Sequence, residues 1–126
     1  MLVDPNRNVL WTANRVIGSM GISLILSDDP NTALVLARLF RPELVITEAV
    51  LSKIDGRELC RAMKGDPLLT GTKVIVMSDV YRGDRYAKEA IEEFGADEFL
   101  EKPVSSFSLR RSIDHFATLP RLAGVM

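Results

Sequence analysis

Short apolar runs alternate along the chain with longer segments in which apolar residues recur every three or four positions. The runs cover residues 1–3, 22–26, 44–46, 74–77 and 99–100. Most of them are continuous rather than alternating, which is typical of parallel strands that helices cover on both faces. The pattern therefore predicts five strands of one parallel sheet.

The segments between these runs have the period of amphipathic helices. They predict helices over residues 6–20, 30–40, 57–64, 85–94 and from residue 106 onward. Gly21 is a stop for the first helix, Pro30 after two aspartates starts the second, and Ser105 is an N-cap for the fifth. Five strands alternating with five helices predict a doubly wound α/β fold, in which ligand chemistry gathers at the carboxyl ends of the strands.

The composition is that of an ordinary globular domain. The chain has 126 residues, of which 47% are hydrophobic and 26% charged. A formal net charge of −1 without a basic run gives no electrostatic attraction to nucleic acid. No signal peptide or membrane-spanning run is predicted. We expect one cytoplasmic domain over residues 1–120, with residues 121–126 as a tail or the start of a linker.

Single cysteine, histidine and tryptophan residues limit the chemistry that can be expected. Cys60 cannot form an internal disulfide and is expected as a small core or boundary residue. His115 has no nucleophile motif beside it and is expected on the surface. No metal site is predicted. Trp11 falls opposite the apolar stripe of its helix, so we expect it to be exposed, as a partner contact or as an isolated surface aromatic.

Polar side chains stand at the carboxyl ends of four predicted strands. Asp4 follows the first strand, Glu48 the third, Ser78 the fourth and Lys102 the fifth. An ammonium stabilises negative charge, a hydroxyl donates to phosphoryl oxygens, and carboxylates hold a hard cation. The four residues therefore form a candidate site for a phosphoryl group or a cation.

Three segments resemble the receiver domains of response regulators. PELVITE at residues 42–48, followed by Ile54-Asp55-Gly56, resembles "PDLVLLD…MDG", and KVIVMS at residues 73–78 resembles "PVIMLT". FGADEFLEKP at residues 94–103 resembles "AGADDYLTKP" and is the most specific piece. The resemblance covers residues 1 to about 117 and implies a CheY-like, flavodoxin-like topology with strand order 2-1-3-4-5.

The resemblance also implies a role for each residue of the candidate site. In receivers, an acidic pair and an acceptor aspartate hold Mg²⁺, and the acceptor takes a phosphoryl group from a histidine kinase. A hydroxyl and a lysine contact the phosphoryl oxygens. By position, Asp4 corresponds to the first acid, Pro5 takes the place of the second acid, and Glu48 takes the acceptor position. Ser78 corresponds to the hydroxyl, Lys102 to the lysine and Phe99 to the switch aromatic. Phe99 is equally well explained as a core residue that prefers an inward position.

Two departures from the family pattern predict a pseudo-receiver. Pro5 carries no carboxylate, so we expect Mg²⁺ binding to be weak or absent and no other cofactor. Glu48 is one methylene longer than aspartate, and a displacement of ~1 Å in a reacting site costs about 10²-fold in rate. We expect Glu48 to pair with Lys102, where its single charge partly imitates phosphoaspartate, which carries about −2.

We therefore expect a signalling module that is not an enzyme and that acts through protein–protein contacts. The expected partners are a histidine kinase or an output protein, with a homodimer through helix 4, strand 5 and helix 5 as a further option, and no direct contact with nucleic acid or membrane. The alternative is a functional phosphoacceptor receiver that regulates an attached or separate output domain and is phosphorylated at this site or on another residue such as Asp55. A small α/β enzyme or flavin carrier is disfavoured, because Pro5-Asn6-Arg7-Asn8 stands where such proteins need a phosphate loop. Residues 79–84 are expected as a solvated charged loop.

Overall fold

The computed structural model of the chain describes residues 1–52 and 54–116. Its five strands form one parallel sheet in the order β2-β1-β3-β4-β5. The strands are β1 (Leu2–Val3), β2 (Leu26–Ser27), β3 (Leu44–Glu48), β4 (Lys73–Ser78) and β5 (Glu98–Glu101). Both the predicted doubly wound fold and the predicted strand order are confirmed.

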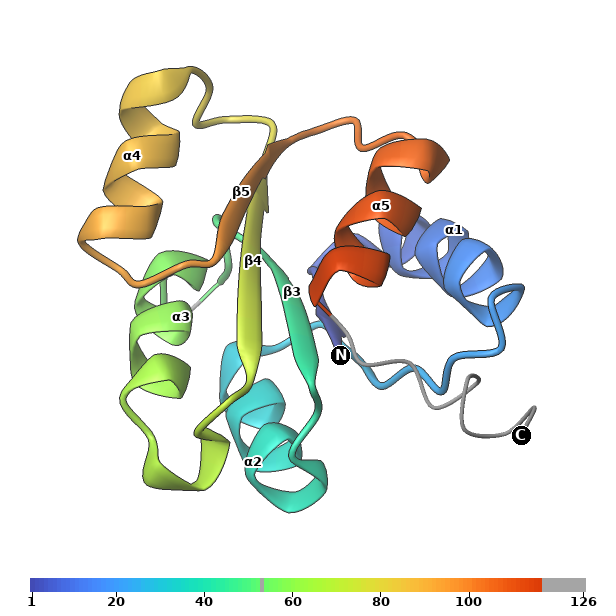
Figure 1. Cartoon of the computed structure of the whole chain (residues 1–126), viewed down its shortest axis with the longest axis horizontal. Helices are drawn as coiled ribbons and strands as arrows, with labels where there is room; N and C mark the ends of the chain where they lie inside the picture. The colour runs from blue at the N-terminus through green and yellow to red at the C-terminus, as the bar shows by residue number, and fades with distance from the viewer. Residues whose placement is uncertain (53, 117–126) are drawn as a thin grey trace.

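Helices cover both faces of this sheet. They are α1 (Arg7–Gly18), α2 (Pro30–Phe40), α3 (Gly56–Lys64), α4 (Asp84–Glu92) and α5 (Ser106–Phe116), with a 3₁₀ turn at Pro67–Leu69. Figure 1 shows α1 and α5 on one side of the sheet and α2, α3 and α4 on the other. No helix in the described ranges is both long and apolar enough to cross a membrane.

The sheet buries a separate apolar cluster under each helical layer. Val74 and Val76 belong to the cluster beneath α2, α3 and α4, whereas Ile75 and Met77 belong to the cluster beneath α1 and α5. Successive side chains of a strand point to opposite faces, so a continuous apolar run supplies both clusters. The covered parallel strands that the sequence predicts are thus confirmed.

The predicted helix starts are confirmed by their caps. Asp29 Oδ2 accepts a hydrogen bond from Thr32 N at 2.8 Å, and Pro30 follows as the first helical residue. Ser105 Oγ accepts from Ser108 N at 3.0 Å. Each of these bonds satisfies a backbone donor that the first turn of a helix leaves without an internal partner.

The predicted boundaries of β2 are wrong. The strand was expected over residues 22–26, but only Leu26 and Ser27 pair with β1. Ile22 and Leu24 pack instead against the cluster beneath α1 and α5. Their apolar character reflects this packing rather than membership of a strand, and periodicity alone does not separate the two in a short run.

Three single-residue predictions also agree with the structure. Trp11 is 68% exposed, and His115 lies on the exposed face of α5. Cys60 is buried, and burial raises the pKa of its thiol to about 12. Residues 117–120 of the expected domain and the expected tail at 121–126 lie outside the described residues.

Candidate functional site

Three of the four predicted site residues meet at the carboxyl edge of the sheet. Lys102, directly after β5, places its Nζ 2.6 Å from Asp4 Oδ2 and 2.5 Å from Glu48 Oε2. Asp4 directly follows β1 and Glu48 is the last residue of β3, so neighbouring strands deliver both carboxylates. We call Asp4, Glu48 and Lys102 the rim triad.

The rim triad is buried. The side chains of Asp4 and Glu48 are 1% and 5% exposed, and that of Lys102 is 14% exposed. Solvent therefore screens these charges far less than it would screen a surface pair. Because the two carboxylates are held away from water, their negative charge depends strongly on the one ammonium between them for its neutralisation.

Backbone amides hold the other oxygens of the two carboxylates. Asp4 Oδ1 accepts from Asn6 N at 2.8 Å, and Glu48 Oε1 accepts from Val50 N at 3.2 Å. Glu48 Oε2 is buried, and among the described residues it accepts no directed hydrogen bond. Its contact with Lys102 is therefore a close approach of charges, whereas Lys102 donates a directed bond to Asp4.

Burial and charge shift the pKa values of Glu48 and Lys102. Burial raises the pKa of the Glu48 carboxyl, against the opposing effects of the Lys102 ammonium and the Val50 amide. Burial lowers the pKa of Lys102, but the bonds and charges of Asp4 and Glu48 outweigh it and leave that pKa raised. One ammonium thus remains charged while it compensates two carboxylates.

This arrangement predicts that the free energy of unfolding depends on pH through the titration of Glu48. A carboxyl whose pKa is raised on folding binds its proton more tightly in the folded state. Its stabilising contribution is complete below the ordinary value of 4.5 and is lost as pH rises through the raised folded value. Urea unfolding between pH 4 and 8 should show this loss in the wild type. In Glu48→Gln the corresponding slope should vanish, and an unchanged slope would assign it to another group.

Ser78, the fourth predicted residue, organises the loop that follows β4. Its buried hydroxyl oxygen accepts from Val80 N and Tyr81 N, both at 3.0 Å. The Ser78 carbonyl oxygen accepts from Lys102 N at 2.8 Å, but in the part of the chain that the structure describes the Ser78 hydroxyl has no hydrogen bond to a side chain of the rim triad. Ser78 therefore lies at the predicted edge, while its observed contacts hold the β4–α4 loop.

Phe99 takes the inward position that the sequence predicts. It is half-buried in β5 and packs, as Tyr81 does, against the cluster beneath α2, α3 and α4. This packing explains Phe99 as a core residue without further assumptions. Its role as a switch aromatic stays a prediction.

Two residues near the site have contacts that the sequence did not indicate. A Cβ on Gly56 would lie 1.8 Å from the carbonyl oxygen of Glu48, and Gly56 N donates to Ala49 O at 2.7 Å. Arg82 Nη1 donates to Lys102 O at 2.8 Å. Residues 79–84, expected only as a solvated loop, are therefore tied to the end of β5. Gly56 is part of the sequence motif, but the sequence does not indicate which atoms Gly56 contacts.

The site fits a bound divalent cation poorly. Each carboxylate oxygen of Asp4 and Glu48 already faces an amide or the Lys102 ammonium. Pro5 supplies no further carboxylate. The described residues contain no group of three or more His, Cys, Asp or Glu that could hold a metal ion. Mg²⁺ needs near-octahedral oxygen ligands, and here an ammonium stands between the two carboxylates that would provide them.

The fold agrees with the similarities found among known proteins. Residues 1–114 match the model of the response regulator receiver domain, so the chain belongs to that family. It is a receiver module of two-component signalling rather than an enzyme, and receiver domains interact with kinases and outputs in such signalling.

Individual relatives show the same relationship. The chain is 25% identical over 105 residues to the alkaline phosphatase synthesis transcriptional regulatory protein PhoP of Bacillus subtilis, covering 83% of this chain and 42% of PhoP. It is 24% identical over 113 residues to protein PilG of Pseudomonas aeruginosa, covering 90% of this chain and 82% of PilG. The chain thus spans less than half the length of PhoP. The structure of the chemotaxis response regulator CheY4 of Vibrio cholerae superposes with a TM-score of 0.83 at 17% identity, covering 92% of this chain and 95% of CheY4.

Proposed function

We propose that this receiver is degenerate and acts through protein–protein contacts without conventional phosphorylation of an aspartate. The observation that carries the proposal is the rim triad. Glu48, at the position that the resemblance gives to the acceptor, faces the Lys102 ammonium at 2.5 Å. That ammonium would contact the phosphoryl oxygens in a working receiver, and here a carboxylate of this chain already compensates it.

The backbone around Glu48 supports the same proposal. Glu48 Oε1 accepts from Val50 N, and Gly56 packs against the Glu48 carbonyl. A phosphoryl transfer requires the attacking oxygen to be within reach of the donor and aligned with it. The longer side chain instead directs one oxygen to Val50 and the other to Lys102. The Mg²⁺ that receivers use would in addition have to displace an ammonium.

Asp55 is a poor alternative acceptor. It caps α3 by accepting from Arg57 N at 2.7 Å, and its two oxygens also contact the guanidinium of Arg57. Removing these contacts would take away the helix cap and one of the two carboxylates that pair with Arg57, the other being Glu89. Asp55 is therefore committed to the start of α3.

A permanently compensated site would leave this domain in one arrangement that its partners recognise. Arg82 and Lys102 link the β4–α4 loop to the end of β5, so the triad and the α4–β5–α5 side are mechanically connected. The partner that recognises this side could be a kinase, an output protein or a second copy. It would then bind a surface whose conformation does not change. The beryllofluoride-activated NtrC4 receiver forms a dimer in solution, which makes a homodimer a natural partner to test.

Treatment with acetyl phosphate and millimolar Mg²⁺ should leave the intact mass of this protein unchanged. The expected result follows from the missing carboxylate at Pro5 and the paired carboxylate of Glu48. CheY4, treated in parallel, serves as a receiver control for the reagent. The variant Pro5→Asp/Glu48→Asp is the matched test within this chain and should gain an adduct. A stoichiometric, base-labile adduct on the wild type would contradict the proposal.

A further inference from the structure

A groove lies between α1 and α5, on the face of the sheet that Figure 1 shows beneath these two helices. Its volume is about 430 Å³, which is within the range of pockets that bind small molecules. The buried side chains of Leu2, Ile46 and Met77 bring β1, β3 and β4 to its floor. Its apolar walls are Val9, Ala13, Val16, Val104 and Leu109. We call it the α1–α5 groove.

The α1–α5 groove lies at the point where the strand order reverses. Leu2 of β1 pairs with Ile46 of β3. From this pair the sheet continues to β2 on one side and to β4 and β5 on the other. In open α/β sheets, ligands bind near the carboxyl ends of the strands at such a point. The place of the groove in the fold therefore favours a ligand-binding role.

Uncharged polar side chains surround the mouth of the groove. Asn6 caps α1, Asn8 and Thr12 belong to that helix, and Ser106 is the first residue of α5. All four residues are exposed, so a ligand can replace the water on them. Amide and hydroxyl groups both donate and accept hydrogen bonds. These side chains can therefore orient a polar ligand without selecting the sign of its charge.

The charged residues of the lining favour a cation. They are Lys102 and Asp79. The Lys102 ammonium is already held between Asp4 and Glu48. Asp79 is exposed and makes no ion pair with any residue that the structure describes. An anion would therefore meet three carboxylates and an ammonium that is already compensated, whereas a cation gains a carboxylate partner.

The neighbouring arginines do not reverse this balance. Arg7 follows the cap of α1, but its guanidinium lies 3.6 Å from the Asp28 carboxylate. Arg82 lies 3.7 Å from the Glu101 carboxylate. Neither arginine lines the groove. Side-chain oxygens of this chain also cap the first turns of α1 and α5, which reduces the attraction of those turns for an anion.

We propose that the α1–α5 groove binds a small organic cation, with an apolar body between the two helices and an ammonium or amidinium group that faces Asp79. The ligand lies beside Lys102 without replacing either of its carboxylate partners. This inference uses the observed pairing of Lys102 and does not depend on whether Glu48 accepts a phosphoryl group.

Three probes of matched shape separate charge from apolar contact. Benzamidinium, benzamide and benzoate carry the same ring with a positive, a neutral and a negative group. Benzamidinium, titrated into the full chain, should shift the methyl resonances of Val9, Val16 and Val104 saturably. It should bind up to about fivefold more tightly than benzamide, the gain from a partly exposed ion pair. Benzoate should bind more weakly than benzamide.

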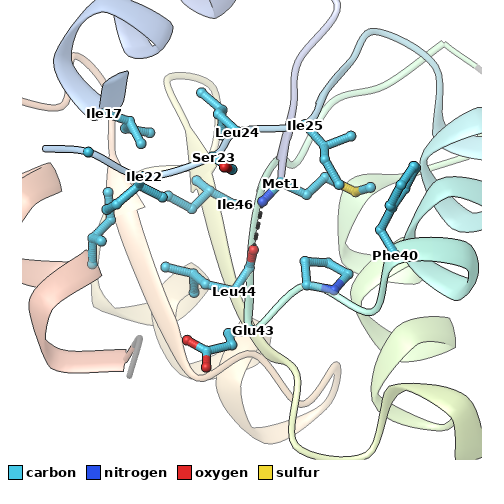
Figure 2. Close-up of a pocket in the computed structure, with 13 residues that line it drawn as sticks. Met1, Ile17, Ile22, Ser23, Leu24, Ile25, Phe40, Glu43, Leu44 and Ile46 are labelled. Atoms are coloured by element: carbon cyan, nitrogen blue, oxygen red, sulfur yellow. Dashed lines mark hydrogen bonds between the residues drawn. The ribbon is translucent and has the colours of Figure 1, made fainter. Parts of the chain in front are cut away.

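The apolar hollow at the amino ends of β1 and β3 is the internal control. Its volume is about 580 Å³, and Figure 2 shows Ile22, Leu24 and Phe40 around it. It lies at the opposite end of the sheet from the rim triad. Ring contact alone would shift the Ile22 and Leu24 methyl resonances as much as those of the α1–α5 groove. Equal shifts in the two places would overturn the proposal.

Asp79→Asn tests the assigned charge. It should leave the binding of benzamide unchanged and remove the advantage of benzamidinium. Asp84→Asn changes an exposed aspartate at the start of α4, outside the groove, and as the matched control should keep that advantage. The proposal is wrong if benzamidinium has no advantage in the wild type, if its advantage survives Asp79→Asn, or if benzoate binds the most tightly. The absence of any saturable shift at the groove would equally overturn it.

Discussion

Lys102→Met should lower the free energy of unfolding by about 3–5 kcal/mol at neutral pH, the cost of removing one partner from a buried ion group. The variant leaves Asp4 and Glu48 facing each other at 1% and 5% exposure without a compensating cation. One of the two must then bind a proton or draw water into the site. We expect a marked fall of the urea midpoint, partly recovered at low pH, where a carboxyl can be protonated.

Glu48→Gln should cost far less, at most about 1 kcal/mol, because burial already disfavours the charged form of Glu48 and glutamine removes that charge. The geometry of the rim triad makes the two substitutions unequal. Lys102 keeps its directed bond to Asp4 at 2.6 Å when Glu48 loses its charge. Glutamine can also keep an oxygen for the Val50 amide, so the principal change is the loss of the close contact with Lys102.

The double variant Glu48→Gln/Lys102→Met should cost less than the sum of the single variants, because both remove the same contact. Urea unfolding of the four proteins at one pH measures this coupling. Lys73→Met, at the exposed start of β4, is the matched control and should change stability by less than about 0.5 kcal/mol. Strict additivity would show that Glu48 and Lys102 do not interact in solution.

Gly56→Ala should also be strongly destabilising, by about 3 kcal/mol or more, at the upper end of the usual cost of overpacking. The added Cβ would lie 1.8 Å from Glu48 O and 3.0 Å from Ala49 Cα, and both are backbone atoms of a buried strand end. α3 would have to move away from β3, breaking the bond from Gly56 N to Ala49 O. A lower thermal midpoint, or failure to accumulate folded protein, is the expected result.

Gly18→Ala provides the comparison for this substitution. Gly18 is the last residue of α1, and nothing lies within 4 Å of an added Cβ. The change should be neutral or stabilising by up to about 1 kcal/mol, because alanine restricts the unfolded chain and favours helix. If both variants had the same stability, the close approach of α3 to Glu48 would not exist in solution.

The sequence determined the architecture, because the interactions that define it leave local signatures. A strand buried on both faces must be apolar throughout, so Val74 to Met77 identified a covered parallel strand. Helix caps are equally local, and Asp29 and Ser105 cap the helices they were expected to start. The edge shared by Asp4, Glu48 and Lys102 followed from the rule that parallel strands present their carboxyl ends together.

The tertiary structure alone decided how those residues meet. Asp4 and Lys102 are 98 residues apart, and no local pattern indicates that one ammonium contacts two carboxylates. The same holds for Gly56, whose contact with the Glu48 carbonyl depends on where α3 docks. Apolar residues 22–25 could equally have belonged to a strand or to a packed loop, since burial demands the same side chains of both. The pattern of apolar residues along the chain therefore determines which residues are buried. Which residues they contact depends on distances in the folded structure, which the sequence pattern does not contain.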